Sequence, residues 1–222
     1  MKRRGLGFIV GFLFCLPGCF AHLGGLVGKK DMAKVDVEGL SKRSFYVMTL
    51  MQEASISYSD AIISIEEANG KKEEAEKLKQ LVAKLKAKPS KEDNKVLIQE
   101  ENKAVADIEK NNDIGKINAA EGKKFMGEAI VSVGIGILLD GTAATEGAVL
   151  LKEGKSALTR VPSTTVSRVK DAFDVATLAT EEIPRQAKNM KSFSGKLVDR
   201  FNEIPFLSAA EIAKKAKEVE KE

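Results

Sequence analysis

The sequence has few of the residues from which many enzymes and metal proteins build their sites. Its 222 residues include no tryptophan, one histidine (His22) and two cysteines (Cys15 and Cys19). Metal sites built on His and Cys need several such ligands, and a Ser-His or Cys-His nucleophile needs a histidine beside it. His22 lies in a glycine-containing stretch near the N-terminus, where we interpret it as a polar linker residue. We therefore expect no metal and no cofactor.

Aromatic residues and net charge narrow the classes of binding partner. The chain has no tryptophan and only two tyrosines, Tyr46 and Tyr58, besides its ten phenylalanines, which argues against a glycan-stacking cleft. The net charge is +4, and three of the positive charges belong to Lys2, Arg3 and Arg4. The rest of the chain is nearly neutral, so bulk charge predicts no basic face that could release counterions from nucleic acid. We expect no nucleic-acid partner.

Short motifs that could carry catalysis are incomplete. Gly134-Ile135-Gly136 begins a dinucleotide-binding G-x-G-x-x-G, but Leu139 stands where the third glycine should be. Ser167 to Lys170 matches S-x-x-K, but no S-D-N or K-T-G partner accompanies it. The many carboxylates alternate with lysines at helical spacing, which is typical of a solvated face. The sequence predicts a protein that is not an enzyme and identifies no catalytic residue and no small-molecule substrate.

The N-terminus has the layout of an export signal. A basic start is followed by an apolar stretch over residues 6–16 and then by Leu16-Pro17-Gly18-Cys19. This segment resembles the signal of bacterial lipoprotein precursors, whose lipobox is a Leu, a small residue, and Gly or Ala before Cys. Leu16, Gly18 and Cys19 fit that pattern, and Pro17 replaces the commoner Ala or Ser. The resemblance covers about twenty residues.

The resemblance implies how the chain is processed and located. It places cleavage between Gly18 and Cys19, with acyl chains such as palmitate anchoring Cys19 in a lipid bilayer. Residues 1–18 would be the signal peptide and residues 19–40 a lipidated tether. Phe20 is not the aspartate that holds some lipoproteins at the inner membrane, so the resemblance favours the outer membrane, facing the periplasm.

An uncleaved membrane anchor is the competing interpretation. Residues 5–28 carry no formal charge and are long enough to cross a hydrocarbon core of about 30 Å. Their glycines and Pro17 make this stretch a poor helix former. Both interpretations place the remainder of the chain outside the cytoplasm, because the basic start stays inside.

Residues 41–222 are expected to form a single all-α domain, a helical bundle with a long helical hairpin. From Ser41 on, apolar residues follow the 4-3 spacing of a coiled-coil seam. The seam consists of Val47, Met51, Ala54, Tyr58, Ala61 and Ile65. It could pack against the chain's own helices or dock a partner helix, and both alternatives remain open.

Local signals predict where the helices begin and end. Asn69-Gly70 is expected to kink or end the first helix. Pro89-Ser90 is expected to form a turn, in which Ser90 and Asp93 make a capping box. Asn111 to Asp113 marks the next break. Pro184 is expected to open a further helix, and Pro205 to end it.

The segment from Ala129 to Leu151 is apolar and rich in glycine. Asp140-Gly141-Thr142 predicts a turn between two limbs, which gives a buried apolar hairpin with close glycine contacts at Gly134 and Gly136. The alternative is membrane insertion, as in the helical pore-forming toxins, which the chain resembles in layout only. The first limb reaches only about 17 Å as a helix, and a longer span would place Asp140 in lipid.

These observations predict a non-enzymatic helical lipoprotein of the bacterial cell envelope. We expect it to act as a scaffold or interaction subunit, either with an envelope protein partner or by self-association. A membrane-active protein that uses residues 129–151 is the alternative function.

Overall fold

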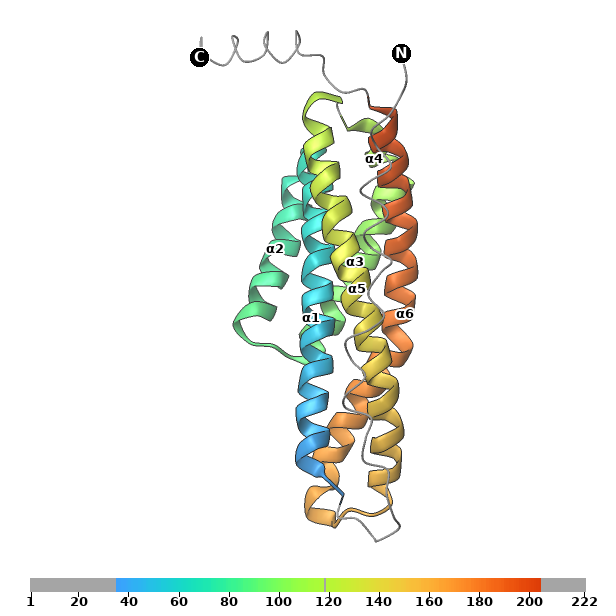
Figure 1. The fold of residues 1–222 in the computed structure, drawn as a ribbon. Coiled ribbons are helices and arrows are strands. Elements are labelled where there is room, and N and C mark those ends of the chain that lie inside the picture. Colours follow the sequence, from blue (N-terminus) through green and yellow to red (C-terminus); the bar gives the residue numbers. More distant parts are fainter. Residues whose placement is uncertain (1–34, 118, 205–222) are drawn as a thin grey trace, which may run out of the picture. The chain divides into compact units, whose positions relative to one another are not determined.

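The computed structural model describes residues 35–117 and 119–204, and this part of the chain is built from helices. Helix accounts for 90% of it, no strand occurs within these ranges, and six α-helices pack together. The predicted all-α helical bundle is confirmed (Figure 1).

Helix α1 (Val37–Ala68) begins with a side-chain cap and ends before a glycine. The carboxylate of Asp36 accepts a hydrogen bond of 2.8 Å from the backbone N–H of Gly39. Gly70 has a φ of +72°, in the left-handed region that glycine adopts without steric cost. The predicted end at Asn69-Gly70 is therefore confirmed, whereas the helix begins at Val37, within the expected tether 19–40.

Helices α2 (Lys72–Ala87) and α3 (Lys91–Lys110) form a hairpin that packs on α1. The Ser90 hydroxyl oxygen accepts a hydrogen bond of 3.0 Å from the backbone N–H of Asp93, as the predicted capping box requires. The chain breaks again after Lys110 and forms the short helix α4 (Asp113–Lys116).

Helix α5 (Ala119–Leu158) is one continuous helix of 40 residues, so the predicted turn at Asp140-Gly141-Thr142 is wrong. Asp140 is buried, with 1% of its surface exposed, and it accepts a hydrogen bond from Tyr58. The Thr142 hydroxyl donates to the carbonyl of Leu138, four residues earlier in the same helix. Since Asp140 finds a partner inside the bundle, it does not need the solvated turn that its local sequence predicts.

Helix α6 (Val166–Glu203) follows the 3₁₀ turn η2 (Ser163–Thr165) and runs through Pro184, so the predicted helix start at Pro184 is wrong. A proline inside a helix costs about 3 kcal/mol, because its nitrogen cannot donate the usual backbone hydrogen bond. Ile183 and Gln186, on either side of Pro184, are both buried. Tertiary packing on both sides therefore outweighs the local cost.

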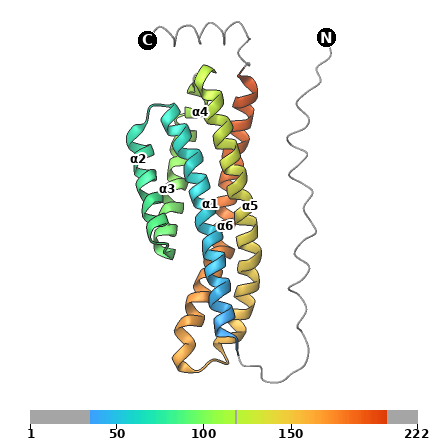
Figure 2. The same cartoon turned by 60° about the vertical axis from the view of Figure 1, so that its left-hand side comes forward.

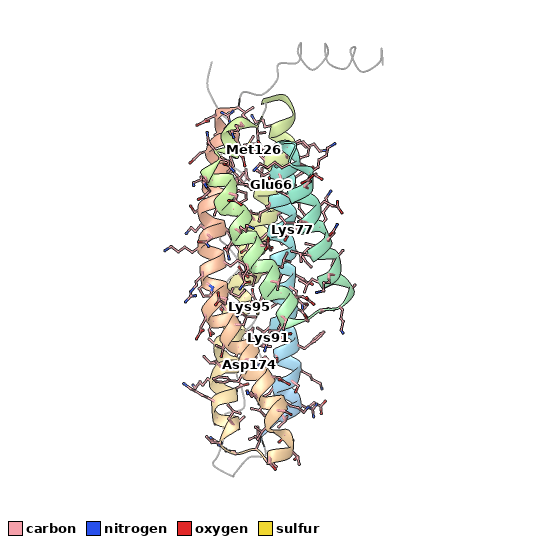
Figure 3. All side chains as sticks on the ribbon, turned by 180° about the vertical axis from the view of Figure 1, so that it is seen from behind. Glu66, Lys77, Lys91, Lys95, Met126 and Asp174 are labelled. Carbon is pink, nitrogen blue, oxygen red and sulfur yellow. The ribbon has the colours of Figure 1, made fainter. Side chains whose placement is uncertain are left out.

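Three long helices, α1, α5 and α6, lie side by side, and the α2–α3 hairpin flanks one end of α1 (Figures 1 and 2). α5 runs antiparallel to α1, since Arg43 pairs with Glu153 and Tyr58 bonds to Asp140 further along. The beginning of α3 lies beside α6, where the Lys91 ammonium is 3.4 Å from the Asp174 carboxylate (Figure 3).

The apolar core forms two clusters along the three long helices. One cluster lies where the hairpin joins them and includes Tyr58, Leu97, Met126 and Phe193. The other lies toward the opposite end, where the N-terminal half of α1 meets the C-terminal half of α5 and the N-terminal half of α6. The long helices thus keep one face of α5 inside the bundle along its length, and its other face lies outside.

Candidate functional site

The structure places the predicted seam of α1 inside the bundle. Its members Val47, Met51, Ala54, Tyr58, Ala61 and Ile65 each have no exposed surface. α5, α6 and the hairpin cover this face of α1. A partner helix has no access to the seam while the bundle keeps this fold, so a docking surface has to be sought elsewhere.

The outer face of α5 is an exposed helix surface without charged side chains. This outer face consists of Val131, Ile135, Leu138, Thr142, Thr145 and Val149, with the small residues Gly134, Gly141 and Ala148 between them. Val131 is 62% exposed and Leu138 55%, although both side chains are large and apolar. From Val131 to Val149 the helix is about 27 Å long. Glu146, the one charged residue in this interval besides Asp140, lies toward α1, 3.9 Å from Arg43.

The composition of α5 separates it from the other helices. From Gly122 to Leu158 it is long and apolar enough to cross a membrane, with a mean hydropathy of 1.4 in its most apolar window, and no other described helix is. Only 28% of that window is buried within the bundle. The expectation that residues 129–151 form a buried hairpin is therefore wrong, because α5 is one continuous helix and only one of its faces is buried. Ile135, which belongs to the limb expected to be buried, is 48% exposed.

The glycines of α5 divide between its two faces. A Cβ added at Gly136 would lie 2.3 Å from the Tyr58 ring, and one added at Gly147 would lie 2.6 Å from the Ala179 side chain. These inward glycines allow neighbouring helices to approach closely. Gly134 and Gly141 have no heavy atom within 4 Å of an added Cβ, so the close contact predicted at Gly134 is wrong.

Tyr58 and Asp140 form a buried polar pair between α1 and α5. The Tyr58 hydroxyl donates a hydrogen bond of 2.7 Å to Asp140 Oδ2, and Tyr58 has no exposed surface. Burial raises the pKa of Asp140 to about 7, although the hydrogen bond from Tyr58 acts in the opposite direction. Burial also raises the pKa of Tyr58, so its hydroxyl keeps its proton and remains a donor.

A second polar group joins α1, α3 and α6. Glu101 is fully buried, and it accepts hydrogen bonds of 2.7 Å from the Ser59 hydroxyl and 2.6 Å from the Gln186 amide. The Gln186 amide also lies 3.3 Å from the Ser55 hydroxyl. Burial raises the pKa of Glu101 well above its usual range, despite both hydrogen bonds. These contacts fix the register of three helices inside the core.

Gln52 and Asn94 continue this polar stripe. Ser59 and Glu101 are 42 residues apart, and so are Gln52 and Asn94, so a parallel register places the second pair at one level of α1 and α3. Both are buried, and the amide nitrogens of both have no hydrogen-bond partner.

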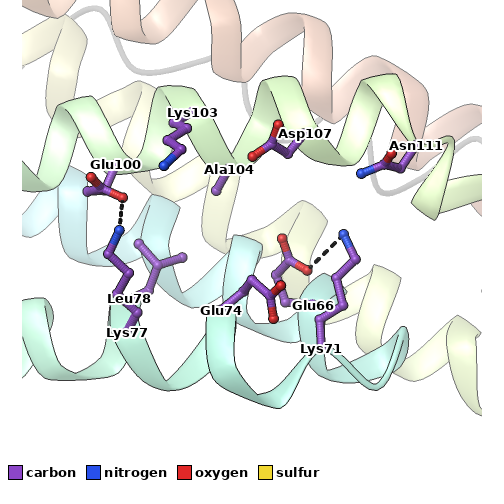
Figure 4. A pocket seen from close by; sticks show the side chains of 10 residues that line it. All are labelled: Glu66, Lys71, Glu74, Lys77, Leu78, Glu100, Lys103, Ala104, Asp107 and Asn111. Atoms are coloured by element: carbon purple, nitrogen blue, oxygen red, sulfur yellow. Dashed lines mark hydrogen bonds and ion pairs between the residues drawn. The ribbon is translucent and has the colours of Figure 1, made fainter.

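A groove of about 310 Å³ opens between α2 and α3, beside the end of α1 (Figure 4). Its lining holds four carboxylates and three lysines. Lys77 pairs with Glu100, and the Lys71 ammonium lies 3.5 Å from Glu66, whose pKa burial raises. Since carboxylates and lysines are interleaved along its lining, the groove does not favour a ligand of either sign. No group of three or more His, Cys, Asp or Glu side chains in the described ranges is arranged to hold a metal ion.

The predicted lipidation site Cys19, the cleavage residue Gly18 and the linker residue His22 lie outside the described residues. So does the end of the chain from Pro205 onward. These predictions depend on the sequence alone.

The sequence prediction missed the outer face of α5 and the polar contacts of Tyr58 and Glu101. One signal for the outer face was present, because Gly134, Gly141 and Ala148 follow one another at intervals of seven residues. Comparison with protein-family models, with curated proteins and with solved structures finds no match for this chain.

Proposed function

We propose that this protein is a non-enzymatic helical lipoprotein, anchored in the bacterial envelope through Cys19, whose bundle serves as a scaffold or interaction subunit of an envelope assembly. The anchor part of the proposal depends on the resemblance of residues 1–19 to a lipoprotein signal. By that resemblance the bundle faces the periplasm from the outer membrane.

The interaction part depends on one observation, the exposed outer face of α5. Water in contact with apolar surface costs about 25 cal/mol per Å², so a face of large apolar side chains gains free energy when it is covered. Contiguous exposed apolar patches on soluble domains commonly mark interaction sites. The other faces of the bundle carry many lysines and acids, and Val131, Ile135 and Leu138 stand apart from them on one uncharged stretch.

The test is capture of the tagged full chain from intact envelopes after a charge is placed on this face. Leu138→Glu should abolish co-purification of the partner, because the carboxylate would have to be desolvated in the complex. Val96→Glu is the matched control, since Val96 is 45% exposed but belongs to α3. Loss with Leu138→Glu alone supports the proposal. Equal capture by both variants and the wild type refutes it.

A second candidate function, a membrane-active protein, is favoured by the continuity of α5. An unbroken helix of this length removes the objection that each limb is too short to span a bilayer. The cost of this function is that α5 would have to leave the bundle. Asp140 would then lose Tyr58, and the buried inner face of α5 would lose its contacts with α1 and α6.

Dye-loaded liposomes distinguish the two functions. A soluble version that begins after Gly28 should cause no leakage if the protein is an interaction subunit. Leakage that Ile135→Asp abolishes would establish the membrane-active function instead. Because Ile135 is 48% exposed, this variant should remain folded, and its circular dichroism spectrum provides the check.

A further inference from the structure

We propose that the outer face of α5 pairs in antiparallel orientation with the same face of a second copy of this chain. The inference deepens the proposed function and rests on it, because it identifies the partner of the interaction surface. Three features of the face point to a second copy: the spacing of its residues, its glycines and the charges at its two ends.

The outer face has the repeat of a helix–helix seam. Its residues recur at intervals of seven, which is the heptad spacing by which two helices remain in contact along their length. Three such series run along the face: Val131, Leu138 and Thr145; Gly134, Gly141 and Ala148; and Ile135, Thr142 and Val149. Lipid requires only apolar residues, whereas a closely packed second helix also requires small residues at this spacing, and Gly134, Gly141 and Ala148 supply them.

The glycines of the outer face make no close packing contact with the described residues. Glycine is the poorest helix former after proline, and Gly134 and Gly141 leave open space where a side chain would stand. Gly136 and Gly147 differ, because the Tyr58 ring and Ala179 occupy the space that they leave. Small residues on an exposed face allow another helix backbone to approach closely. Leu138 of one copy could lie over Gly141 of the other.

The charges that flank the face select the orientation. Glu128 and Lys152 are both exposed, and each lies twelve residues from Asp140 along α5. Glu128 also lies 3.9 Å from Lys124 of its own helix, in an exposed contact that leaves the carboxylate accessible to Lys152 of the other copy. In an antiparallel pair centred on the level of Asp140, Glu128 of each copy faces Lys152 of the other, and the two contacts form together over about 36 Å of helix. A parallel pair would instead place like charges together, which repel.

The proposed assembly stops at two copies, because a two-fold axis makes both copies use the same face and leaves none free for a third. One helix face is a small interface, and the proposed lipid anchor compensates for this. Two chains held in one membrane have a higher effective concentration than two chains in free solution. Pairing is therefore expected in envelopes rather than in dilute solution.

Disulfide cross-linking of the full chain in its own envelope tests both the partner and the orientation. Close to the two-fold axis a residue meets its own copy, so Gly141→Cys should give a cross-linked dimer on mild oxidation. Gly141 is exposed and has room for a side chain. Far from the axis, Val131→Cys alone and Val149→Cys alone should give no dimer, but the two variants expressed together should. Val96→Cys and the chain without an added cysteine are the controls.

Two results would overturn the inference. A dimer formed by Val131→Cys alone would show a parallel pair, and no dimer with Gly141→Cys would show that no second copy covers the face. In the second case, a membrane-impermeant maleimide tells whether Cys at position 141 is shielded by lipid. If Leu138→Glu still abolishes capture of a partner, the proposed function stands and only the identity of that partner changes.

Discussion

The Tyr58 hydroxyl lies 2.7 Å from the Asp140 carboxylate, and the ring of Tyr58 packs over Gly136, one helical turn before Asp140. This contact joins α1 to the middle of α5, where the sequence alone predicts a turn. It supplies a polar partner to a buried acid and fills the space above a glycine. The contact therefore keeps α5 straight and turns the apolar residues on its opposite side toward the exterior.

Removing this hydrogen bond should destabilise the bundle. Tyr58→Phe keeps the ring over Gly136 but leaves Asp140 without its donor, which should lower the free energy of unfolding by about 1–3 kcal/mol. Urea unfolding of a soluble version beginning after Gly28 measures this. Tyr46→Phe, at a tyrosine that is 45% exposed, should change little. Equal effects of the two variants would contradict the role given to the Tyr58 hydroxyl.

Stability should increase as the pH falls from 8 to 5. Burial raises the pKa of Asp140 to about 7 and that of Glu101 well above its usual range. In the unfolded chain such acids release their protons near pH 4, so across this window the folded state binds more protons than the unfolded state. This contribution to stability is fully present below the unfolded pKa of about 4, and it is lost as the pH rises through the folded pKa of about 7, so stability at pH 5 exceeds stability at pH 8.

The midpoints of urea unfolding at pH 5 and pH 8 test whether the protein is more stable at the lower pH. Asp140→Asn should reduce the difference between the two midpoints, because an amide does not titrate but still accepts the hydrogen bond from Tyr58. A midpoint that is higher at pH 8 than at pH 5 would contradict the assignment of buried, protonated carboxyl groups.

Two glycines on opposite faces of α5 should respond in opposite ways to the same substitution. Gly136→Ala places a methyl group 2.3 Å from the Tyr58 ring and should cost about 1–3 kcal/mol. Gly134→Ala fills open space and should add about 0.5–1 kcal/mol through helix propensity. The melting temperatures of both variants and the wild type, measured at low protein concentration, test these opposite changes in stability. Destabilisation by Gly134→Ala to the same extent would show that this face is packed.

Lipidation of Cys19 is testable independently of the bundle. Cys19→Ser should leave an unprocessed precursor and prevent incorporation of labelled fatty acid. Cys15→Ser, four residues earlier, is the matched control and should be processed normally. A wild-type chain that takes up no label and retains Met1 to Gly18 would instead be held by an uncleaved anchor.

The sequence predicted those features that neighbouring residues determine. The end of α1 at Asn69-Gly70 and the Ser90 cap are local, and both are confirmed. Asp140-Gly141-Thr142 and Pro184 carry equally strong local signals, but partners distant in sequence overrule them. The outer face of α5 could not be predicted from hydropathy, because a helix that is apolar all round does not indicate which of its sides the bundle covers.

The outer face of α5 is expected to be covered in the envelope, and cysteine labelling measures this most directly. Leu138→Cys should be protected from a membrane-impermeant maleimide in isolated envelopes and should react readily in the purified, dilute soluble domain. Val96→Cys, similarly exposed on α3, should react in both settings. Labelling of Leu138→Cys in envelopes at the same rate as in the dilute domain would contradict the account, because the face would then remain in contact with water.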